Sequence, residues 1–285
     1  MPSTPSPLRY PGGKTAIYDM VSRIINDNEL KRGNYIEPYA GGAGLALSLL
    51  LNSQVHEIYL NDIDRSIYAL WHSILNNSEK LCRMIEKTEI SIENWHKAKL
   101  VQKNKATASL LKLGFSTLFL NRTNRSGIIN GGVIGGLEQI GNYKLDCRFN
   151  KEKLIQKIRR IAKYRYRIHF YNLDAIEFLE IMSQTLPKNS FYCIDPPYYV
   201  KGSTLYTNAY APDDHKLLAK VILKLKSPWI LTYDDVPDIQ KLYRSREQYR
   251  FHLNYSAANK RIGTELLVKS KKLYFNNSLK LDPAC

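Results

Sequence analysis

The first part of the chain alternates apolar and glycine-rich segments in the order expected of a β–α–β unit. Residues 34–51 predict a short strand, a glycine-rich turn and an apolar helix, and residues 57–60 predict a second strand. Elements in this order and at this spacing are typical of a parallel sheet covered by helices. Ahead of them, apolar residues recur at helical spacing and predict an amphipathic helix over residues 14–25.

From about residue 65 to residue 163 the pattern is mainly helical. The helices predicted there are 67–75, 79–86 and 109–120. A polar segment over residues 121–141 is too rich in glycine for a regular helix. Strand patterns return at 168–171, 191–194 and 229–232. Two further apolar runs, 251–255 and 265–268, are joined by a polar loop and predict a terminal hairpin.

These patterns predict an α/β fold in two parts. Residues 1–64 and 164–285 are expected to form an α/β core, and residues 65–163 are expected to form a mainly helical insertion. No internal repeat or long low-complexity segment interrupts this organisation.

Composition excludes several classes of protein. The 285 residues are 44% hydrophobic and 24% charged, which is a globular composition rather than a disordered or collagen-like one. No apolar run approaches the roughly 18 residues that a membrane span requires, and the N-terminus lacks the features of a signal peptide. The four cysteines are scattered without a Cys-x-x-Cys pair, so a reducing, cytoplasmic location is expected rather than a disulfide or zinc scaffold.

The charge balance points to a polyanionic partner. The chain carries 42 Lys and Arg residues against 26 Asp and Glu residues, a formal net charge of +16. Such an excess attracts nucleic acid, anionic membrane surfaces and acidic proteins alike. A basic surface that serves only solubility has the same composition, so charge alone leaves the partner open.

The segment Pro11–Thr15 ends like a nucleotide-binding P-loop but lacks the first glycine of that motif. A P-loop needs a glycine five positions before Gly13 and a strand ahead of the loop, whereas Leu8 occupies that position and follows a proline-rich tail. The segment instead predicts a tight turn at a helix N-terminus. There Lys14 and the flanking Tyr10 could hold an anionic group or stack on a ring; a plain helix-start turn is the alternative.

The glycine-rich turn over residues 37–44 predicts a ligand site at the end of the first strand. Its glycines let the backbone approach a ligand closely, although it lacks the GxGxxG fingerprint of dinucleotide-binding proteins. Asp62 ends the second strand 18 residues after Gly44, where a carboxylate can accept both hydroxyls of a ribose. Either feature alone often just ends an element. The pair indicates a nucleoside-containing cofactor at the carboxyl edge of the sheet.

The sequence Asp195-Pro196-Pro197-Tyr198 directly follows the strand predicted at 191–194. Two prolines at a strand end cannot donate to the sheet and fix φ, so they form a rigid exit. This turn presents a carboxylate, a backbone carbonyl and an aromatic face, which complement the two N–H donors and the planar ring of an exocyclic amine. A Pro-Pro loop without function would leave the flanking acid and aromatic residue unexplained.

With these segments the chain resembles the Dam-type DNA adenine-N6 methyltransferases. The resemblance rests on Tyr10–Lys14, Glu37–Gly44, Asn61–Asp62, Phe119–Arg122 and Asp195–Tyr198. It covers nearly the whole chain, with a target-recognition region between the cofactor motifs and the catalytic motif. It implies a Rossmann-like sheet that binds S-adenosylmethionine, an inserted target-recognition domain, and methyl transfer to adenine N6 in double-stranded DNA.

The resemblance also assigns residues to cofactor binding and to catalysis. The cofactor-binding residues would be Tyr10, Lys14, Glu37, Gly41, Gly42, Asp62, Asp174 and Asp195. Asp195 and the carbonyl of Pro196 would accept the two N–H bonds of the adenine amino group, and Tyr198 would stack on a base flipped out of the duplex. The nitrogen recovers its lone pair and attacks the methyl group in one in-line displacement. This needs no metal ion and no covalent enzyme intermediate.

DNA contacts are expected from the insertion. The residues predicted to make them are Asn121, Arg122, Asn124, Arg125 and Asn130, whose donors suit phosphates and base edges. The stretch Lys151–Arg167 carries eight Lys and Arg residues against one acid, and part of it would contact phosphates and make binding salt-dependent. GATC-methylating members of the family tend to show an Arg-x-Asn pattern after the Asn-Arg loop. Residues 127–132 lack it, so GATC is not predicted as the recognition sequence.

Other functions share part of this pattern. A cytosine-N4 DNA methyltransferase or an RNA adenine methyltransferase would use the same amine chemistry. Asp195 at the first position of its motif favours adenine, and the insertion favours duplex DNA. A catalytically silent DNA-binding regulator would be expected to lack Lys14, Asp62 or Asp195, and all three are present. A dehydrogenase would need the GxGxxG turn. A monomer is expected, and a restriction endonuclease acting on the same site is a partner that such an enzyme can have.

Overall fold

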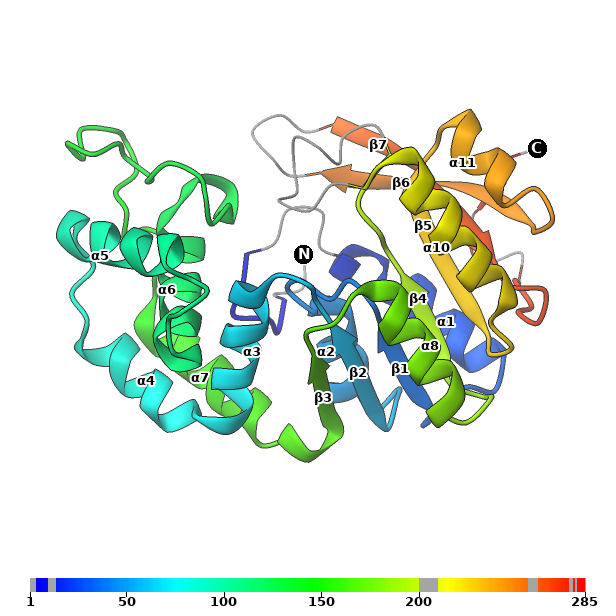
Figure 1. The fold of residues 1–285 in the computed structure, drawn as a ribbon, viewed down its shortest axis with the longest axis horizontal. Coiled ribbons are helices and arrows are strands. Elements are labelled where there is room, and N and C mark those ends of the chain that lie inside the picture. The colour runs from blue at the N-terminus through cyan, green and yellow to red at the C-terminus, as the bar shows by residue number, and fades with distance from the viewer. Residues whose placement is uncertain are drawn as a thin grey trace.

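The computed structural model describes residues 4–9, 14–199, 210–255, 261–276, 279 and 281–284, and for 253–255 and 261–262 the backbone alone. These residues form one mixed sheet with helices on both faces and a helical part beside it (Figure 1). An α/β fold with a sheet and a largely helical insertion was predicted from the sequence, and the α/β class is confirmed.

The described strands lie in one sheet in the order β3 (Ile168–Tyr171), β2 (Glu57–Asn61), β1 (Asn34–Glu37), β4 (Phe191–Ile194), β5 (Trp229–Asp234), β7 (Arg261–Lys269), β6 (Gln248–Tyr255) and β8 (Asp282–Pro283). The strands from β3 to β5 are parallel, whereas β7, β6 and β8 are antiparallel to their neighbours. The pairing of β6 with β7 confirms the predicted hairpin, which extends the sheet beyond β5.

The order of the parallel strands reverses between β1 and β4. The chain places β2 and β3 on one side of β1, and β4 and β5 on the other. In open α/β sheets, ligands bind outside the carboxyl ends of the strands at such a reversal. The ends of β1 and β4 are therefore where the fold favours a site.

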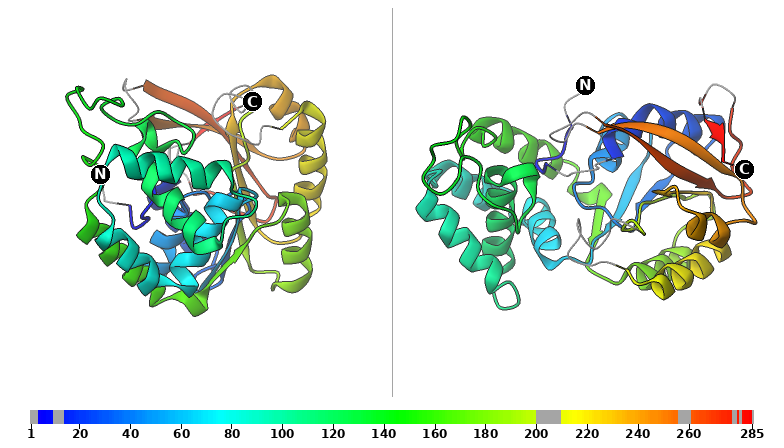
Figure 2. Two further views of the ribbon diagram at one scale, coloured as in Figure 1. Left: turned by 60° about the vertical axis from the view of Figure 1, so that its left-hand side comes forward. Right: turned by 90° about the horizontal axis from the view of Figure 1, so that it is seen from above.

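Helices cover both faces of this sheet, because successive strand residues point to opposite sides. One face packs against α1 (Tyr18–Asp27) and α2 (Gly44–Leu51), and the other against α8 (Ala175–Thr185), α10 (Pro212–Lys224) and α11 (Pro237–Leu242) (Figure 2). In β1, Tyr35 belongs to the first face and Ile36 to the second, and both are fully buried. Burial on both faces explains the continuous apolar runs of the central strands.

The helical part lies beside the β3 edge of the sheet (Figure 1). Its helices are α4 (Ser78–Lys87), α5 (Ile92–Lys103), α6 (Leu110–Thr123) and α7 (Lys151–Ala162), with α3 (Arg65–Asn76) between them and the sheet. Apolar spacing predicted α3, α4 and α6. It missed α5, which buries only Trp95 and Ala98 while Leu100 is exposed, so its apolar positions follow no clear helical stripe.

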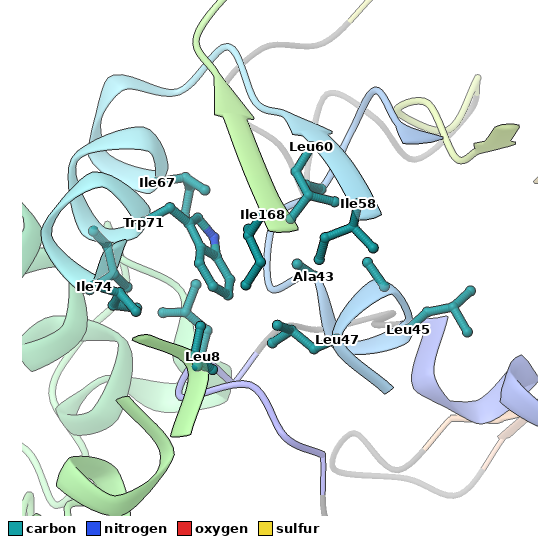
Figure 3. Close-up of a cluster of buried hydrophobic side chains, with 14 of the residues drawn as sticks. Leu8, Ala43, Leu45, Leu47, Ile58, Leu60, Ile67, Trp71, Ile74 and Ile168 are labelled. Atoms are coloured by element: carbon teal, nitrogen blue, oxygen red, sulfur yellow. The ribbon is translucent and has the colours of Figure 1, made fainter. Parts of the chain in front are cut away.

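Trp71 of α3 joins the helical part to the sheet. Its ring stacks on Phe170 of β3 with centroids 5.6 Å apart, and its Nε1 donates to the carbonyl of Gly41, 2.9 Å away. Figure 3 shows the surrounding cluster, in which Leu8 and Ile168 lie near the indole. One hydrophobic core thus runs through the predicted boundary at residue 65. None of the described helices is both long and apolar enough to span a membrane.

Replacing Gly114 with alanine tests the close crossing of α6 over α3. A Cβ atom at Gly114 would lie 2.5 Å from the carbonyl oxygen of Ala69 and 2.7 Å from Ser73 Oγ, so the helices would have to separate. We expect Gly114→Ala to lower the free energy of unfolding by about 1–3 kcal/mol in urea denaturation. Gly132→Ala is the control, because a Cβ there meets nothing within 4 Å. Equal effects of the two substitutions would contradict the tight crossing.

Candidate active site

Side chains from four strands and one short helix meet at the reversal between β1 and β4. The strands contribute Glu37, Asp195, Thr232 and Glu265. The 3-10 helix η1 (Lys14–Ile17), which precedes α1, contributes its first residue. Asp195 follows the last residue of β4, and Pro196 beyond it is buried, so the chain leaves the sheet rigidly at this point.

The Asp195 carboxylate is fixed at one oxygen and open at the other. Thr232 Oγ1 donates to its Oδ1 (2.7 Å), and Lys14 Nζ lies 3.1 Å from the same atom. Among the residues that the structure describes, none donates to Oδ2, and the side chain is 24% exposed. Burial raises the pKa of Asp195; the Lys14 ammonium opposes this rise and the Glu265 carboxylate adds to it.

Glu265 links the buried lysine to the tyrosine of the Pro-Pro turn. Lys14 Nζ lies 2.8 Å from Glu265 Oε2, while Tyr198 OH donates to Glu265 Oε1 (2.5 Å). The ammonium also lies 5.8 Å from the centroid of the Tyr198 ring. Lys14 was predicted to contact a cofactor, and its ammonium here contacts two carboxylates.

Glu37 lies inside the protein beneath the glycine-rich turn. Only 8% of it is exposed, and it accepts from Tyr35 OH (2.8 Å) and from the backbone of Ala46 in α2. Burial raises the pKa of Glu37 to about 8, and the nearby charge of Asp195 contributes to the rise. Glu37 is therefore largely protonated at neutral pH and supports the turn from within.

The glycine-rich turn is anchored to Asp62, the residue that was predicted to bind a ribose. Gly41 has a positive φ of 44°, and its N–H donates to Asp62 Oδ2 (2.9 Å), while the N–H of Asp64 donates to Oδ1 (2.9 Å). The adjoining Gly42 is buried. Burial raises the pKa of Asp62 to about 7, although these two N–H groups lower it. Each carboxylate oxygen retains a lone pair for a further donor.

Asn61 forms hydrogen bonds with the segments that follow β1 and β3. Its Nδ2 donates to the carbonyls of Pro38 (3.1 Å) and Leu173 (3.0 Å), and its Oδ1 accepts from the N–H of Leu173. Asp174 comes next; it is exposed and caps α8 by accepting from the N–H of Ile176 (2.8 Å). The structure thus brings Asp62 and Asp174 to the ends of adjacent strands. The predicted site residue Tyr10 lies outside the described residues.

Asn121 holds the N-terminal segment rather than facing outward. Its Oδ1 accepts from the N–H of Arg9 (2.8 Å), and its Nδ2 donates to the carbonyls of Arg9 (2.7 Å) and Gly127 (2.8 Å). It is 2% exposed. A Cβ at Gly127, where φ is +77°, would lie 2.5 Å from the Arg9 carbonyl oxygen. Direct DNA contact was predicted for Asn121, but its buried amide is used in these hydrogen bonds. We call them the clamp on the N-terminal segment.

Arg122 and Asn124 are also used inside the protein. The Arg122 guanidinium donates to the carbonyl of Pro7, and burial lowers its pKa to about 10. Asn124 is fully buried; it accepts from Trp95 Nε1 (2.7 Å) and donates to two carbonyls of the following loop. Both side chains hold the loop from inside the protein. Their polar groups bind the protein itself rather than the base edges for which they were predicted.

Arg125 and Asn130 have exposed positions on the same loop. Part of the basic stretch Lys151–Arg167 was predicted to contact phosphates, and some of its basic residues are used within the protein. Lys157 donates to the carbonyls of Thr4 and Ser6, and Arg159 pairs with Glu79. The last residues of the stretch directly precede β3, so they lie at the amino edge of the sheet, opposite the site.

The model of the D12 class N6 adenine-specific DNA methyltransferase family matches residues 10–259 of this chain. The chain belongs to this family. It is an adenine-specific DNA methyltransferase that uses S-adenosylmethionine as methyl donor.

The methyltransferase is similar to a curated relative and to solved structures. The Type II methyltransferase M.MjaIII of Methanocaldococcus jannaschii is 24% identical over 237 residues, with 76% of this chain and 79% of the relative covered. A SAM-dependent methyltransferase from Agrobacterium tumefaciens has a TM-score of 0.40 at 9% identity over 90% of this chain. A class I methyltransferase from Listeria monocytogenes has a TM-score of 0.37 at 10% identity over the same share. The chain spans 61% and 59% of those two proteins.

The residues of the methyltransferase suit the chemical groups of S-adenosylmethionine. The partly exposed Asp62 keeps acceptor capacity for ribose hydroxyls, and Asp174 follows the neighbouring strand β3 as the N-cap of α8. The two carboxylates of Asp195 and Glu265 compensate the charge of Lys14, so this cluster carries no net positive charge that would repel a sulfonium nearby.

Sequence reasoning missed Glu265 and Thr232. Glu265 could have been found as a single acid at the start of the apolar run 265–268, because a buried carboxylate is unfavourable without a partner. Thr232 gave no signal, since threonine is common in strands.

The raised pKa of Glu37 predicts a pH dependence of stability. Because its pKa is about 8 in the folded state and about 4.5 in the unfolded state, the folded protein binds the extra proton. Its stabilising contribution is full below pH 4.5 and is lost as pH rises through 8. We expect Glu37→Gln to remove roughly 2–4 kcal/mol of the fall in unfolding free energy between pH 5 and pH 9.

Urea denaturation at both pH values measures this difference. Glu89→Gln, at an exposed position, is the control and should reproduce the wild-type pH dependence. A Glu37→Gln protein that loses as much stability as the wild type would show that Glu37 is ionised at neutral pH.

The clamp on the N-terminal segment predicts that Asn121→Ala frees it. Loss of three hydrogen bonds of a buried amide should cost about 2–3 kcal/mol of stability. Trypsin should then cut faster after Arg9, as measured by mass spectrometry of timed digests. Asn130→Ala, on the exposed side of the loop, should leave both values unchanged. Wild-type cleavage rates for Asn121→Ala would rule out the clamp.

Proposed function

We propose that this methyltransferase acts on double-stranded DNA and flips the target adenine out of the helix into the site between β1 and β4. The observation that supports this most is the state of Asp195. Thr232 and Lys14 hold its Oδ1, while Oδ2 is left to an incoming donor. An exocyclic amino group inside a duplex cannot reach a carboxylate that is only 24% exposed at the end of a strand, so the base must leave the stack.

Asp195 and Pro196 activate the adenine nitrogen in this proposal. The N6 lone pair is delocalised into the ring, which makes the amino group a poor nucleophile. If Asp195 Oδ2 and the Pro196 carbonyl accept its two N–H bonds, the nitrogen can become pyramidal and regain the lone pair. Both acceptors belong to the rigid exit from β4, so they are positioned before the base arrives.

Tyr198 supplies the face on which the flipped base stacks. Its hydroxyl is fixed by Glu265, so the ring costs little further entropy to order. S-adenosylmethionine supplies an electrophilic methyl group when bound. Asp62 would accept from its ribose and Asp174 from its adenine amino group, and the turn at Gly41 and Gly42 would allow its close approach.

The loop that begins at Asn124 would bind the DNA. Arg125 and Asn130 are its exposed polar residues among those predicted for this role, and they suit phosphates and base edges. The net charge of +16 would attract the duplex over a longer range. Asn121, Arg122 and Asn124 would contribute indirectly, because they hold the loop in shape.

A partner restriction endonuclease belongs to the same proposal. The relative from M. jannaschii is named a Type II methyltransferase, and we infer that this enzyme protects a recognition site from a nuclease that cuts there. The site is proposed to differ from GATC, because residues 127–132 lack the Arg-x-Asn pattern.

Asp195→Ala tests the proposed chemistry. The variant should lose at least a thousandfold in transfer of labelled methyl from S-adenosylmethionine to unmethylated plasmid DNA, since it removes the acceptor for the adenine amino group and one of the two carboxylates that contact Lys14. Calorimetry should still detect cofactor binding through Asp62. Asp213→Ala, on the exposed start of α10, is the control and should keep full activity. Methylation-sensitive sequencing of the wild-type product would identify the base and the recognition site, and near-normal turnover by Asp195→Ala would refute the role of this carboxylate.

A further inference from the structure

We propose that Glu265 is a positioning residue for methyl transfer, which sets both the orientation of Tyr198 and the share of the Lys14 charge that reaches Asp195. The inference rests on the proposed function, because it concerns the same site. It adds a residue from the C-terminal hairpin to a centre otherwise built from the parallel strands and η1.

Each oxygen of Glu265 has its own donor. Oε1 accepts from Tyr198 OH at 2.5 Å, and Oε2 accepts from Lys14 Nζ at 2.8 Å. The residue is 2% exposed, so both interactions occur away from bulk water, where charge-assisted hydrogen bonds are strong. A carboxylate so placed fixes the stacking tyrosine and the lysine relative to each other.

The strand register gives a second observation. Glu265 of β7 lies directly opposite Asp234 of β5, and Asp234 Oδ1 accepts from the N–H of Tyr199 (2.9 Å). One pair of facing residues therefore holds two consecutive residues of the turn after β4, Tyr198 by its side chain and Tyr199 by its backbone. Carboxylates directly opposite each other weaken a sheet, so the arrangement costs stability that a purely structural pair would not need.

Lys14 connects this pair to the reacting centre. Its ammonium lies between Glu265 Oε2 and Asp195 Oδ1. If the Glu265 charge is removed, a larger share of the ammonium charge acts on Asp195 and weakens that carboxylate as an acceptor for the adenine amino group. The Tyr198 hydroxyl loses its charged acceptor in the same step and is held less firmly. Both effects act on the transition state rather than on cofactor binding, because Asp62 and the glycine-rich turn follow β2 and β1, away from β7 in the strand order.

The charge on Glu265 also affects when Asp195 ionises. The titratable groups that face Asp195 are Lys14 from η1, Glu265 from β7, Glu37 from β1, Tyr233 from β5 and Cys193 on its own strand. The Glu265 carboxylate raises the pKa of Asp195. Its removal therefore moves the acid limb of the activity profile to lower pH, a change that loss of packing alone would not produce.

Glu265→Gln is the test, with the wild type and Asp195→Ala as references for the proposed function. We expect kcat for methylation of unmethylated plasmid DNA to fall roughly 10- to 100-fold. The Kd for S-adenosylmethionine should change less than about threefold, and the acid limb of kcat against pH should move to lower pH. Glu247→Gln is the matched control, because Glu247 pairs with Lys269 on the far side of the hairpin; it should match the wild type throughout.

Two comparisons decide between a positioning and a merely structural role. Tyr198→Phe should lower kcat without moving the acid limb, and its combination with Glu265→Gln should cost less than the product of the single effects. Wild-type kcat for Glu265→Gln overturns the inference, as does a fall in kcat matched by weaker cofactor binding with the acid limb unmoved. If the wild type methylates DNA and Asp195→Ala does not, either result refutes the role of Glu265 alone.

Discussion

One buried ammonium group holds the catalytic end of this fold together. Lys14 lies between the carboxylates of Asp195 and Glu265, with less than a tenth of its side chain exposed. Removing one partner of a buried ion pair leaves an uncompensated charge that costs several kcal/mol. The start of the chain, the end of β4 and the C-terminal hairpin must therefore arrive at one point for any of them to be stable there. The surplus of negative charge at this point is suited to a reaction in which a sulfonium delivers a methyl group to a nitrogen that becomes positive.

The hairpin explains how a doubly wound sheet acquires this surplus. The parallel strands alone bring Glu37 and Asp195 to the reversal between β1 and β4, and burial keeps Glu37 largely uncharged. The insertion of β7 beside β5 adds a carboxylate from the opposite chain direction. The strand that extends the sheet beyond β5 thus also completes the electrostatics of the site.

The sequence was enough to predict those parts of the site that follow directly from one strand or from the regular spacing of parallel strands. Asp195 to Tyr198 follow their strand directly, and the turn at Gly41 and the carboxylate of Asp62 are related by the regular spacing of parallel strands. Glu265 could not be found in this way, because its place depends on the register of an antiparallel pair. Asn121 shows a different limit: an amide beside an arginine suits DNA and a protein backbone equally, and only burial separates the two roles. The helix α5 was missed because its position depends on its contacts with α6 and not on its own apolar periodicity.

The N-terminal segment has a consequence for how such an enzyme can change its target. Asn121 and Arg122, in the last turn of α6, bind the backbone of Arg9 and Pro7, and Lys14 follows only five positions after Arg9. In the loop after α6, the buried Asn124 accepts from Arg9 through its carbonyl, whereas Arg125 and Asn130 are exposed. Under the proposed function, substitutions at the exposed positions would alter which sequence is read while the reacting groups keep their positions. Specificity would then evolve by exchange of a few exposed side chains on a loop whose buried residues stay the same.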